Sequence, residues 1–367
     1  MRRLLPVSLT ALALLAPLAA CGSDTDDAAS GTAPGAEVTV ADDGTVAGAP
    51  APADTAASGT GLADSVTVEG AYGPIDIPAE PQRIVGDLMA LDYLTALGID
   101  ADRFVGVFDA GFFPEDHYLA DELGREGLVD PGFQWEPNLE VLAASDPDLI
   151  VLPFDQIDGA PQLSEMEEIA PVLVVPTSDT RDPRVRYGGT ASFQDWRSTL
   201  RSFGEVFDRQ DEAESYIAET EAEITALQDD YGDVIPETTA TEMKSTPDFV
   251  AINALSTALE SGVLGTILLS ELGFAAPPQQ AAATVDEFGS IDISQENLDL
   301  VDGDLLFVEV REDTKTYGES PLWDTLSVVQ NGGVAEVGNH WEYGGAQAAR
   351  VVLADIRAAL DGLASRS

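Results

Sequence analysis

The sequence predicts an α/β protein of two lobes, with one long helix connecting them and a ligand cleft between them. Residues 82–107 have the pattern of a strand, a helix that ends at Gly98, and a second strand, which is typical of a βαβ unit in a parallel sheet. The thirteen residues EVLAASDPDLIVL at 140–152 are echoed by ENLDLVDGDLLFV at 296–308, so the chain uses one kind of unit twice. Between these copies, residues 193–231 have a helical pattern.

The N-terminal lobe, residues 65–192, is expected to contain a mainly parallel sheet with an apolar interior. After the first βαβ unit, PNLE begins a helix, Asp146–Pro147–Asp148 forms a turn, and LIVL is a buried strand. The segment SEMEEIAPVLVVP adds another helix and strand, separated at Pro171. We expect one α/β layer structure from this alternation.

The connecting region, residues 193–232, is expected to hold a single helix of about twenty residues, or about 30 Å. DEAESYIAETEAEITALQDDYG has a stripe at helical spacing, and its other face is almost entirely acidic. The stripe consists of Ala213, Tyr216, Ile217, Thr220, Ile224 and Leu227. Gly232 and Pro236 follow as stop signals, so we interpret the helix as a strut between the lobes.

The C-terminal lobe, residues 233–367, is expected to repeat the topology of the first. It begins with the strand DFVAINAL and the helix GVLGTILLSELGF, and it continues with the second copy of the repeat. The strand GVAEVG follows, and the chain closes with an amphipathic helix whose apolar face carries Val351, Leu353, Ile356 and Leu360.

The first 64 residues indicate secretion and attachment to a membrane. Residues 1–21 contain two arginines, a short apolar segment and the ending LAAC, which looks like a bacterial lipobox with Cys21 as the lipidated residue. Cys21 is the only cysteine of the chain, so lipidation explains it better than a disulfide or a free thiol. Residues 22–64 lack aromatic side chains and have the composition of a disordered tether. We expect the protein on the outer face of the cytoplasmic membrane.

The net charge of −49, from 66 acidic and 17 basic residues, excludes nucleic acid as a partner. Most of the carboxylates are interpreted as a solvated surface. Basic residues are scarce, and only Lys244 and Lys315 are lysines. A cluster of basic residues in this chain is therefore a candidate anion-binding feature.

Glu140 and Glu296 begin the two copies of the repeat, each at the expected start of a helix. Asn138 and Ser294 are the predicted N-caps, and a carboxylate in the first turn is favoured by the helix dipole by about 0.3–1 kcal/mol. That stabilisation alone accounts for either glutamate singly. As a pair in two similar lobes, they predict two anionic docking points for arginines of a partner. We expect both away from the ligand, at the end opposite the carboxyl ends of the strands.

The loops that follow strands supply the candidate ligand-binding residues. Aromatic rings with a few converging cations suit a bulky, partly apolar chelate with anionic oxygens. For each aromatic, packing in the core is the alternative, and for the arginines it is pairing with Asp179 and Asp182. The candidates are Trp135, Phe154, Arg181, Arg184, Arg186, Tyr187, Arg311, Tyr317, Trp323, Trp341 and Tyr343.

Catalytic and metal-binding patterns are missing from the sequence. His117 and His340 are the only histidines, and two isolated histidines do not make a zinc or manganese site. No nucleophile elbow, Walker A motif or Cys/His pair occurs. We therefore expect a binding protein that needs neither a cofactor nor a metal of its own.

Six segments in order resemble the ferric-siderophore and cobalamin substrate-binding proteins of ABC importers, from about residue 66 to the C-terminus. They are PQRIV, EPNLEVLAASDPDLIVL, EMEEIAPVLVV, SELGF, ISQENLDLVDGDLLFV and SPLWDTLSVV. The resemblance implies two Rossmann-like lobes joined by one rigid helix, a ligand in the cleft with small closure on binding, and a monomer that serves a permease and its ATPase. It also implies that Glu140 and Glu296 form salt bridges to arginines of the permease.

The resemblance leaves the ligand open. Ferrichrome-binding relatives have an arginine where this chain has Gln134, so we take Arg311 as the substitute. The scarcity of cations favours a ferric hydroxamate or another chelate of low charge over a triscatecholate. Cobalamin or haem on the same fold is the alternative ligand, and a surface receptor or adhesion lipoprotein without transport is the alternative function.

Overall fold

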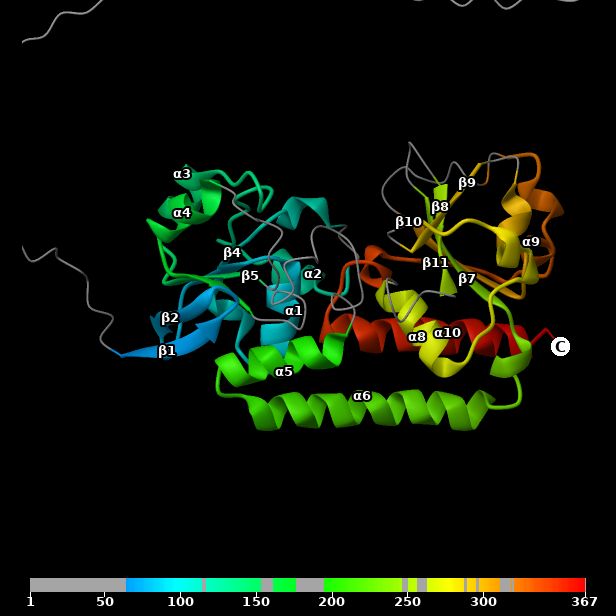
Figure 1. Ribbon diagram of the computed structural model, residues 1–367, viewed down its shortest axis with the longest axis horizontal. Coiled ribbons are helices and arrows are strands. Elements are labelled where there is room, and N and C mark those ends of the chain that lie inside the picture. The colour runs from blue at the N-terminus through cyan, green and yellow to red at the C-terminus, as the bar shows by residue number, and fades with distance from the viewer. Residues whose placement is uncertain are drawn as a thin grey trace, which may run out of the picture. The chain divides into compact units, whose positions relative to one another are not determined.

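The computed structural model describes residues 64–113, 117–152, 161–175, 195–245, 250–255, 263–286, 289–294, 297–310, 318 and 320–366 (Figure 1). The chain divides into two units, residues 1–59 and 60–367, and everything described below belongs to the second unit. The signal segment, Cys21 and nearly all of the tether lie outside the described residues.

A β-hairpin that the sequence analysis missed precedes the first lobe. It pairs β1 (Ser65–Gly70) with β2 (Gly73–Pro78) in antiparallel register. Gly73 has a φ of 114°, which only glycine adopts without strain, so it closes the turn. The turn is bound to the lobe, because the Ala71 amide donates to the Val174 carbonyl at 2.9 Å.

The first lobe contains a four-stranded, all-parallel sheet in the order β4-β3-β5-β6, as the sequence predicts. Its strands are β3 (Ile84–Gly86), β4 (Phe104–Val107), β5 (Leu149–Leu152) and β6 (Val172–Val174). Its helices are α1 (Leu88–Ala96), α2 (Ala120–Leu123), α3 (Leu139–Ala144) and α4 (Pro161–Glu167), with short 3-10 turns η1 (Ala101–Arg103) and η2 (Ala110–Phe112). The α1 helix ends before Gly98, which has a φ of 75°, and this confirms the predicted stop.

Two helices occupy the region predicted to be helical between the lobes. They are α5 (Trp196–Val206) and α6 (Gln210–Tyr231), and they are separated at Asp208, which has a φ of 53°. The predicted stripe on α6 is confirmed, except that Tyr216 is only half-buried; the buried members are Ala213, Ile217, Thr220, Ile224 and Leu227. The α6 helix has 22 residues and stands between the strands of the first sheet and those of the second along the chain.

The second lobe contains a five-stranded mixed sheet in the order β11-β10-β7-β8-β9. Its strands are β7 (Ala240–Ser245), β8 (Val250–Asn253), β9 (Ser290–Ile293), β10 (Leu305–Val310) and β11 (Val334–Val337). Its α-helices are α8 (Leu264–Leu272), α9 (Ser327–Gln330) and α10 (Ala346–Ala364). The 3-10 turns are η4 (Ile235–Glu237), η6 (Pro278–Ala282), η7 (Leu298–Val301), η9 (Trp323–Thr325) and η10 (Asn339–Trp341).

The expectation of one shared topology is only partly correct. The order β11-β10-β7-β8 matches β6-β5-β3-β4 strand for strand, so both copies of the repeat lie beside the central strand of their sheet. However, β8 runs antiparallel to β7, and β9 extends the sheet beyond it. A helix separates β3 from β4, whereas only residues 246–249 separate β7 from β8, and four residues are too few for a parallel crossover.

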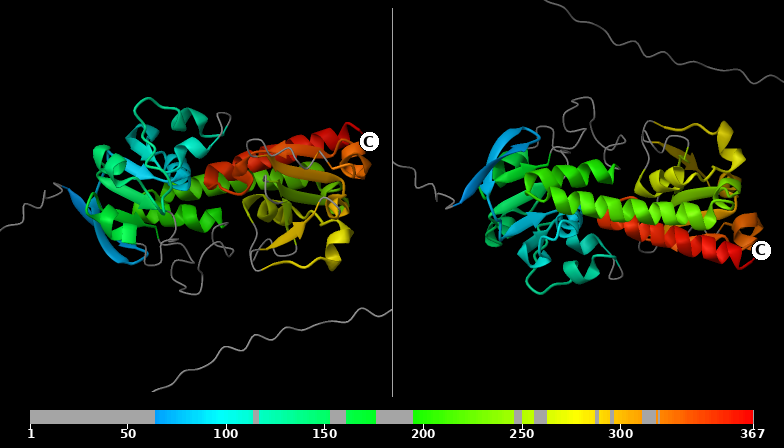
Figure 2. Two further views of the ribbon diagram at one scale, coloured as in Figure 1. Left: turned by 90° about the horizontal axis from the view of Figure 1, so that it is seen from above. Right: turned by 90° about the horizontal axis from the view of Figure 1, so that it is seen from below.

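The C-terminal helix α10 runs beside α6 and in the same direction (Figures 1 and 2). Arg350, near the start of α10, pairs with Glu223, and Arg357, about two helical turns later, pairs with Asp230. α10 also packs against α1 and α5 of the first lobe and α8 of the second. Its buried face includes the predicted Leu353, Ile356 and Leu360, with Val352 buried in place of the half-buried Val351.

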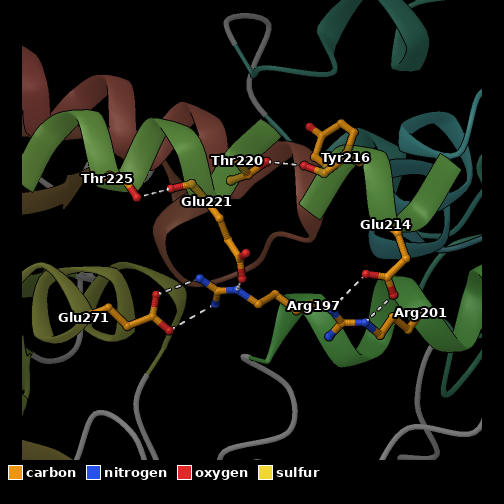
Figure 3. Close-up of polar contacts among 8 residues, drawn as sticks. All are labelled: Arg197, Arg201, Glu214, Tyr216, Thr220, Glu221, Thr225 and Glu271. Carbon is orange, nitrogen blue, oxygen red and sulfur yellow. Dashed lines mark hydrogen bonds and ion pairs between the residues drawn. The ribbon is translucent and has the colours of Figure 1, made fainter. Parts of the chain in front are cut away.

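One apolar core therefore extends from the first lobe to the second. It includes Leu91 of α1, Phe203 of α5, Ile217 of α6, Leu268 of α8 and Val352 of α10, all buried. Arginines of the flanking helices neutralise part of the acidic face of α6. In α5, Arg197 binds Glu221 of α6 and Glu271 of α8, while Arg201 binds Glu214 of α6 (Figure 3).

Candidate functional site

Residues 108–113, which follow β4, lie at the carboxyl edge of the first sheet. Asp130 connects this segment to the next loop, because its two carboxylate oxygens accept from the Gly111 and Gly132 amides at 2.9 and 2.8 Å. The Asp109 amide donates to the Gly132 carbonyl at 3.1 Å. Partial burial, with the Asp130 carboxylate nearby, raises the pKa of Asp109. Ligand loops of parallel α/β sheets lie at this edge.

Two aromatic rings project from these linked loops. Phe112 is 57% exposed and Phe133 is 48% exposed, although most large apolar side chains of this lobe are buried. The Phe133 ring meets the predicted Trp135 edge to face at 4.2 Å, and Trp135 also packs on the core beneath α3. Exposed aromatics with a fixed backbone behind them offer apolar contact area to a ligand.

The described carboxyl edge of the second sheet carries Tyr343. Its ring is 41% exposed, and the Lys244 ammonium lies 5.8 Å from the ring centroid. Lys244, near the end of β7, forms an ion pair with Glu342. The predicted Tyr343 is thus placed at an accessible position beside a cation, but that cation is already paired with a carboxylate.

The two histidines, which the sequence analysis treated as isolated, both contact Tyr118. The Tyr118 ring lies 4.4 Å from His117 and 5.9 Å from His340, between ring centroids. Tyr118 follows β4 and His340 follows β11, so the carboxyl edges of the two sheets meet at this contact. His340 is engaged by Asp355 at 2.8 Å, and among the described residues no group of His, Cys, Asp and Glu could hold a metal ion.

Two predicted ligand-binding tryptophans lie in the core. Trp341 is fully buried, stacks on Phe307 at 4.4 Å and donates from Nε1 to Asp355 at 2.9 Å. Trp323, in η9, is buried in an apolar cluster of the second lobe that includes Met243 and Val308. For both, core packing is the interpretation that the structure favours, because the η10 and η9 turns direct these rings inward.

All four of the predicted ligand-binding arginines and three of the predicted aromatics lie outside the described residues. They are Phe154, Arg181, Arg184, Arg186, Tyr187, Arg311 and Tyr317, and with them Glu296 and Cys21. Their roles stay predictions.

Glu140 occupies the predicted place in the first turn of α3 and is exposed. Asn138 caps this helix, since its Oδ1 accepts from the Glu140 and Val141 amides at 3.1 and 3.2 Å. The Asn138 amide donates to the Pro131 carbonyl at 2.7 Å, which attaches the helix start to the loop that carries Phe133. The expectation that Glu140 lies opposite the carboxyl edge is therefore wrong: a helix that leads into a parallel strand starts at that edge.

The predicted cap at Ser294 is also wrong. Instead of capping a helix, the Ser294 amide and hydroxyl donate to Asn297 Oδ1 at 2.6 and 2.7 Å, and η7 begins only after Asn297.

A buried acidic pair under the second edge was missed by sequence reasoning. Glu242 of β7 and Glu309 of β10 have no exposed surface. Burial, and next the charge of Glu309, raises the pKa of Glu242 well above its usual range. Asn253 donates to Glu242 Oε1 at 3.2 Å. Glu309 lies opposite Lys244 in the strand register. For Glu309, a carboxylate in the otherwise apolar strand LLFVEV was the available signal, whereas β7, with the sequence ATEMKS, gave none for Glu242.

In the described part of the chain, no helix has the length and apolar character needed to span a membrane.

Known proteins share both the sequence pattern and the fold. The profile of the periplasmic binding protein family matches residues 92–340. The probable siderophore-binding lipoprotein YfiY of Bacillus subtilis (strain 168) is 26% identical over 316 residues, which are 79% of this chain and 86% of that protein. The iron(3+)-hydroxamate-binding protein FhuD of the same strain is 24% identical over 331 residues, covering 88% of this chain and 87% of FhuD.

Solved structures of binding proteins superpose on this chain. The petrobactin-binding protein YclQ from Bacillus subtilis does so with a TM-score of 0.60 at 19% identity, over 82% of this chain and 99% of YclQ. SirA of Staphylococcus aureus, complexed with staphyloferrin B, has a TM-score of 0.58 at 21% identity, over 81% of this chain and 98% of SirA. These similarities confirm the two-lobed α/β fold.

Proposed function

Because the chain belongs to the periplasmic binding protein family, we propose that it is the substrate-binding lipoprotein of an ABC importer and captures a ferric siderophore. The observation that carries the proposal is the exposed aromatic pair, Phe112 and Phe133, on loops that Asp130 holds together at the carboxyl edge of the first sheet. The similarity to YfiY and FhuD, which are named as a siderophore-binding and a hydroxamate-binding protein, supports the same ligand class.

We propose a ferric hydroxamate, or another chelate of low charge, as the ligand. The acidic groups at the described edges include Asp109, Asp130 and Glu342, and Lys244 is paired with Glu342. Arg197 and Arg350 are likewise engaged in ion pairs with glutamates of α6. A triscatecholate carries several negative charges and would be repelled by such an edge, whereas a ferric trihydroxamate is close to neutral.

Delivery to a membrane permease completes the proposed function. Lipidation at Cys21 would tether the monomeric protein to the outer face of the cytoplasmic membrane, and residues 22–64 would give it reach. Glu140, exposed at the start of α3, supports docking on permease arginines, with Glu296 as its proposed counterpart. An ATPase bound to the permease would drive import, and the binding protein itself performs no catalysis.

Ligand titration tests the proposal. We expect ferric desferrioxamine B, a trihydroxamate, to quench the intrinsic fluorescence of the purified chain, because Trp135 lies beside Phe133. The Phe112→Ala and Phe133→Ala variants should each weaken binding by about tenfold, while Leu322→Ala, a change at another exposed apolar side chain, should not. Quenching by haem or cobalamin but by no siderophore would overturn the proposed ligand class.

A further inference from the structure

Asp92 of α1 is a fully buried carboxylate that bonds to the opposite end of the chain. Its Oδ1 accepts from the Gln347 amide at 2.9 Å, and its Oδ2 accepts from the Ala348 amide at 3.1 Å. The Tyr118 hydroxyl donates to Oδ2 at 2.6 Å. Because three donors converge on two oxygens, the ionised carboxylate is the form that fits, although burial raises the pKa of Asp92.

These bonds cap α10 from outside the helix. Gln347 and Ala348 lie in its first turn, whose amides have no acceptor within the helix, and its own N-cap position is Gly345, which has no side chain to supply one. A Cβ at position 345 would stand 2.5 Å from Asp92 Oδ1, so glycine leaves the room that the carboxylate occupies. The carboxylate also lies at the positive end of the helix dipole.

Gln347 also binds α1 through its side chain, so that here α10 supplies the side chain and α1 the acceptors. Its side-chain amide donates to the Asp92 carbonyl at 3.0 Å and to the Thr95 hydroxyl at 2.6 Å. The start of α10 is thus bound to α1 through both main-chain and side-chain groups. We call this set of contacts between Asp92, Thr95, Tyr118, Gln347 and Ala348 the α1–α10 junction.

The α1–α10 junction lies next to both candidate ligand-binding edges. On the first lobe, Tyr118 belongs to the segment after β4, close to Phe112 and Phe113 in sequence and linked to them by ring contacts through His117. On the second lobe, α10 directly follows η10 and Tyr343. The C-terminal end of α10 is attached to the second lobe. There Arg366 donates to the carbonyl of Asn331, a residue just before β11, at 2.8 Å.

We infer that Asp92 is a positioning residue, which holds the start of α10 on α1 and thereby fixes the spacing between the two ligand-binding edges. The ligand-binding consequence rests on the proposed function, but the spacing itself does not. Asp92→Asn turns one acceptor into an amide donor that faces amide donors, so the junction opens without any loss of side-chain volume. Gln347→Ala removes only the two side-chain bonds.

The inference is tested by measuring the distance between the lobes without ligand. Spin labels at Asp121→Cys in α2 and Asp324→Cys in η9, both exposed, report the separation in the full chain carrying Cys21→Ser. Matched controls are available. Asp87→Asn alters another buried aspartate that bonds to a helix start, the Ala90 amide of α1, within one lobe. Gln280→Ala removes another glutamine amide that donates to a threonine hydroxyl and a main-chain carbonyl, again within one lobe.

We expect Asp92→Asn and Gln347→Ala to broaden or shift the distance distribution, and both controls to leave it unchanged. An unchanged distribution in Gln347→Ala and in folded Asp92→Asn would overturn the inference. So would an equal shift in the controls, since that would mean general loosening.

Binding of ferric desferrioxamine B adds a second measurement. The two junction variants should bind it about tenfold more weakly than the controls, mainly through faster dissociation. Shifted distances in a chain that binds no siderophore would refute the proposed function and keep the positioning role. Full affinity despite shifted distances would overturn the link between spacing and ligand binding.

Discussion

Asp148 and Asp304, the equivalent aspartates of the two repeat copies, each bind the residues that lead into the neighbouring central strand. The Asp148 carboxylate accepts from the Gln82 and Arg83 amides at 2.8 and 2.9 Å, immediately before β3. The Asp304 carboxylate accepts from the amide and hydroxyl of Thr239 at 2.8 and 2.7 Å, immediately before β7. This aspartate, present in both copies, therefore sets the start of β5 against β3 and of β10 against β7.

This relationship predicts equal costs for equivalent changes in the two lobes. Asp148→Ala and Asp304→Ala should each lower the free energy of unfolding by about 1–3 kcal/mol, because each leaves two donors without their acceptor. Denaturant unfolding measures the loss. Asp299→Ala, a change at an exposed aspartate within the second copy, is the control and should stay within about 0.5 kcal/mol of the parent. A cost in only one lobe would contradict the shared role.

The buried pair of Glu242 and Glu309 predicts a stability that falls as the pH rises. Burial raises the pKa of Glu242, so its stabilising contribution is complete below the ordinary carboxyl pKa and is lost as the pH climbs towards the raised value. The groups that act on it are Glu309, Glu342, Asn253 and Lys244, and of these only Lys244 carries a positive charge.

Glu242→Gln, which keeps the shape and removes the ionisation, should raise the melting temperature at pH 8 by several degrees and change it little at pH 4. Thermal melts across this range measure the effect, with the exposed Glu336→Gln as the control. A parent protein whose stability is flat over that interval would contradict the raised pKa.

Arg197 and Arg201 lie on one helix, but they should differ in their contribution to stability. Arg197 binds Glu271 through two parallel bonds of 3.1 Å and Glu221 at 3.0 Å, so it joins α5, α6 and α8, and its side chain is largely buried (Figure 3). Arg201 binds Glu214 on α6 alone, and both side chains are about half exposed. Exposed pairs contribute little, whereas a buried charge that loses its partner is costly.

We expect Arg197→Ala to cost about 2–4 kcal/mol and Arg201→Ala less than about 1 kcal/mol, by denaturant unfolding. Raising the salt concentration should diminish the second effect more than the first, since exposed pairs are screened more strongly. Equal costs would contradict the bridging role of Arg197.

Local signals predicted much of the fold. Gly98 ends α1, Asn138 caps α3, and the stripe from Ala213 to Leu227 is the buried face of α6, because each depends on residues within one or two turns of helix. The antiparallel β8 and β9 were not predicted, since strand direction depends on partners distant in sequence. The same reason applies to Trp341, whose ring looks like a cleft aromatic in sequence but packs on Phe307.

Less of the candidate site than of the fold could be predicted from the sequence. Phe112 and Phe133 could not be distinguished from core aromatics in the sequence, because only the structure shows their exposure. Asp92 and Gln347 are 255 positions apart, and no local sequence pattern at either residue predicts their contact. The contact of His340 with Tyr118 was missed for the same reason, because contacts between distant segments leave no periodic trace in the sequence.

Glu140 offers a test of permease docking that is separable from ligand binding. Its carboxylate is exposed at a capped helix start and can meet an arginine without any change in the fold. Glu140→Ala should therefore lower siderophore-dependent uptake in cells by about tenfold, and the double variant with Glu296→Ala should abolish it. Ligand affinity and melting temperature should stay at the values of the parent.

Glu136→Ala is the matched control, because Glu136 is exposed on the loop that leads into α3, four residues before Glu140. It should leave uptake unchanged, since general loss of negative charge is small against a net charge of −49. Normal uptake by the double variant would eliminate the docking role, and an equal loss in Glu136→Ala would reduce it to a nonspecific effect of charge. Because α3 starts at the carboxyl edge, a docked permease would contact the protein beside the proposed ligand rather than at the far end of the lobe.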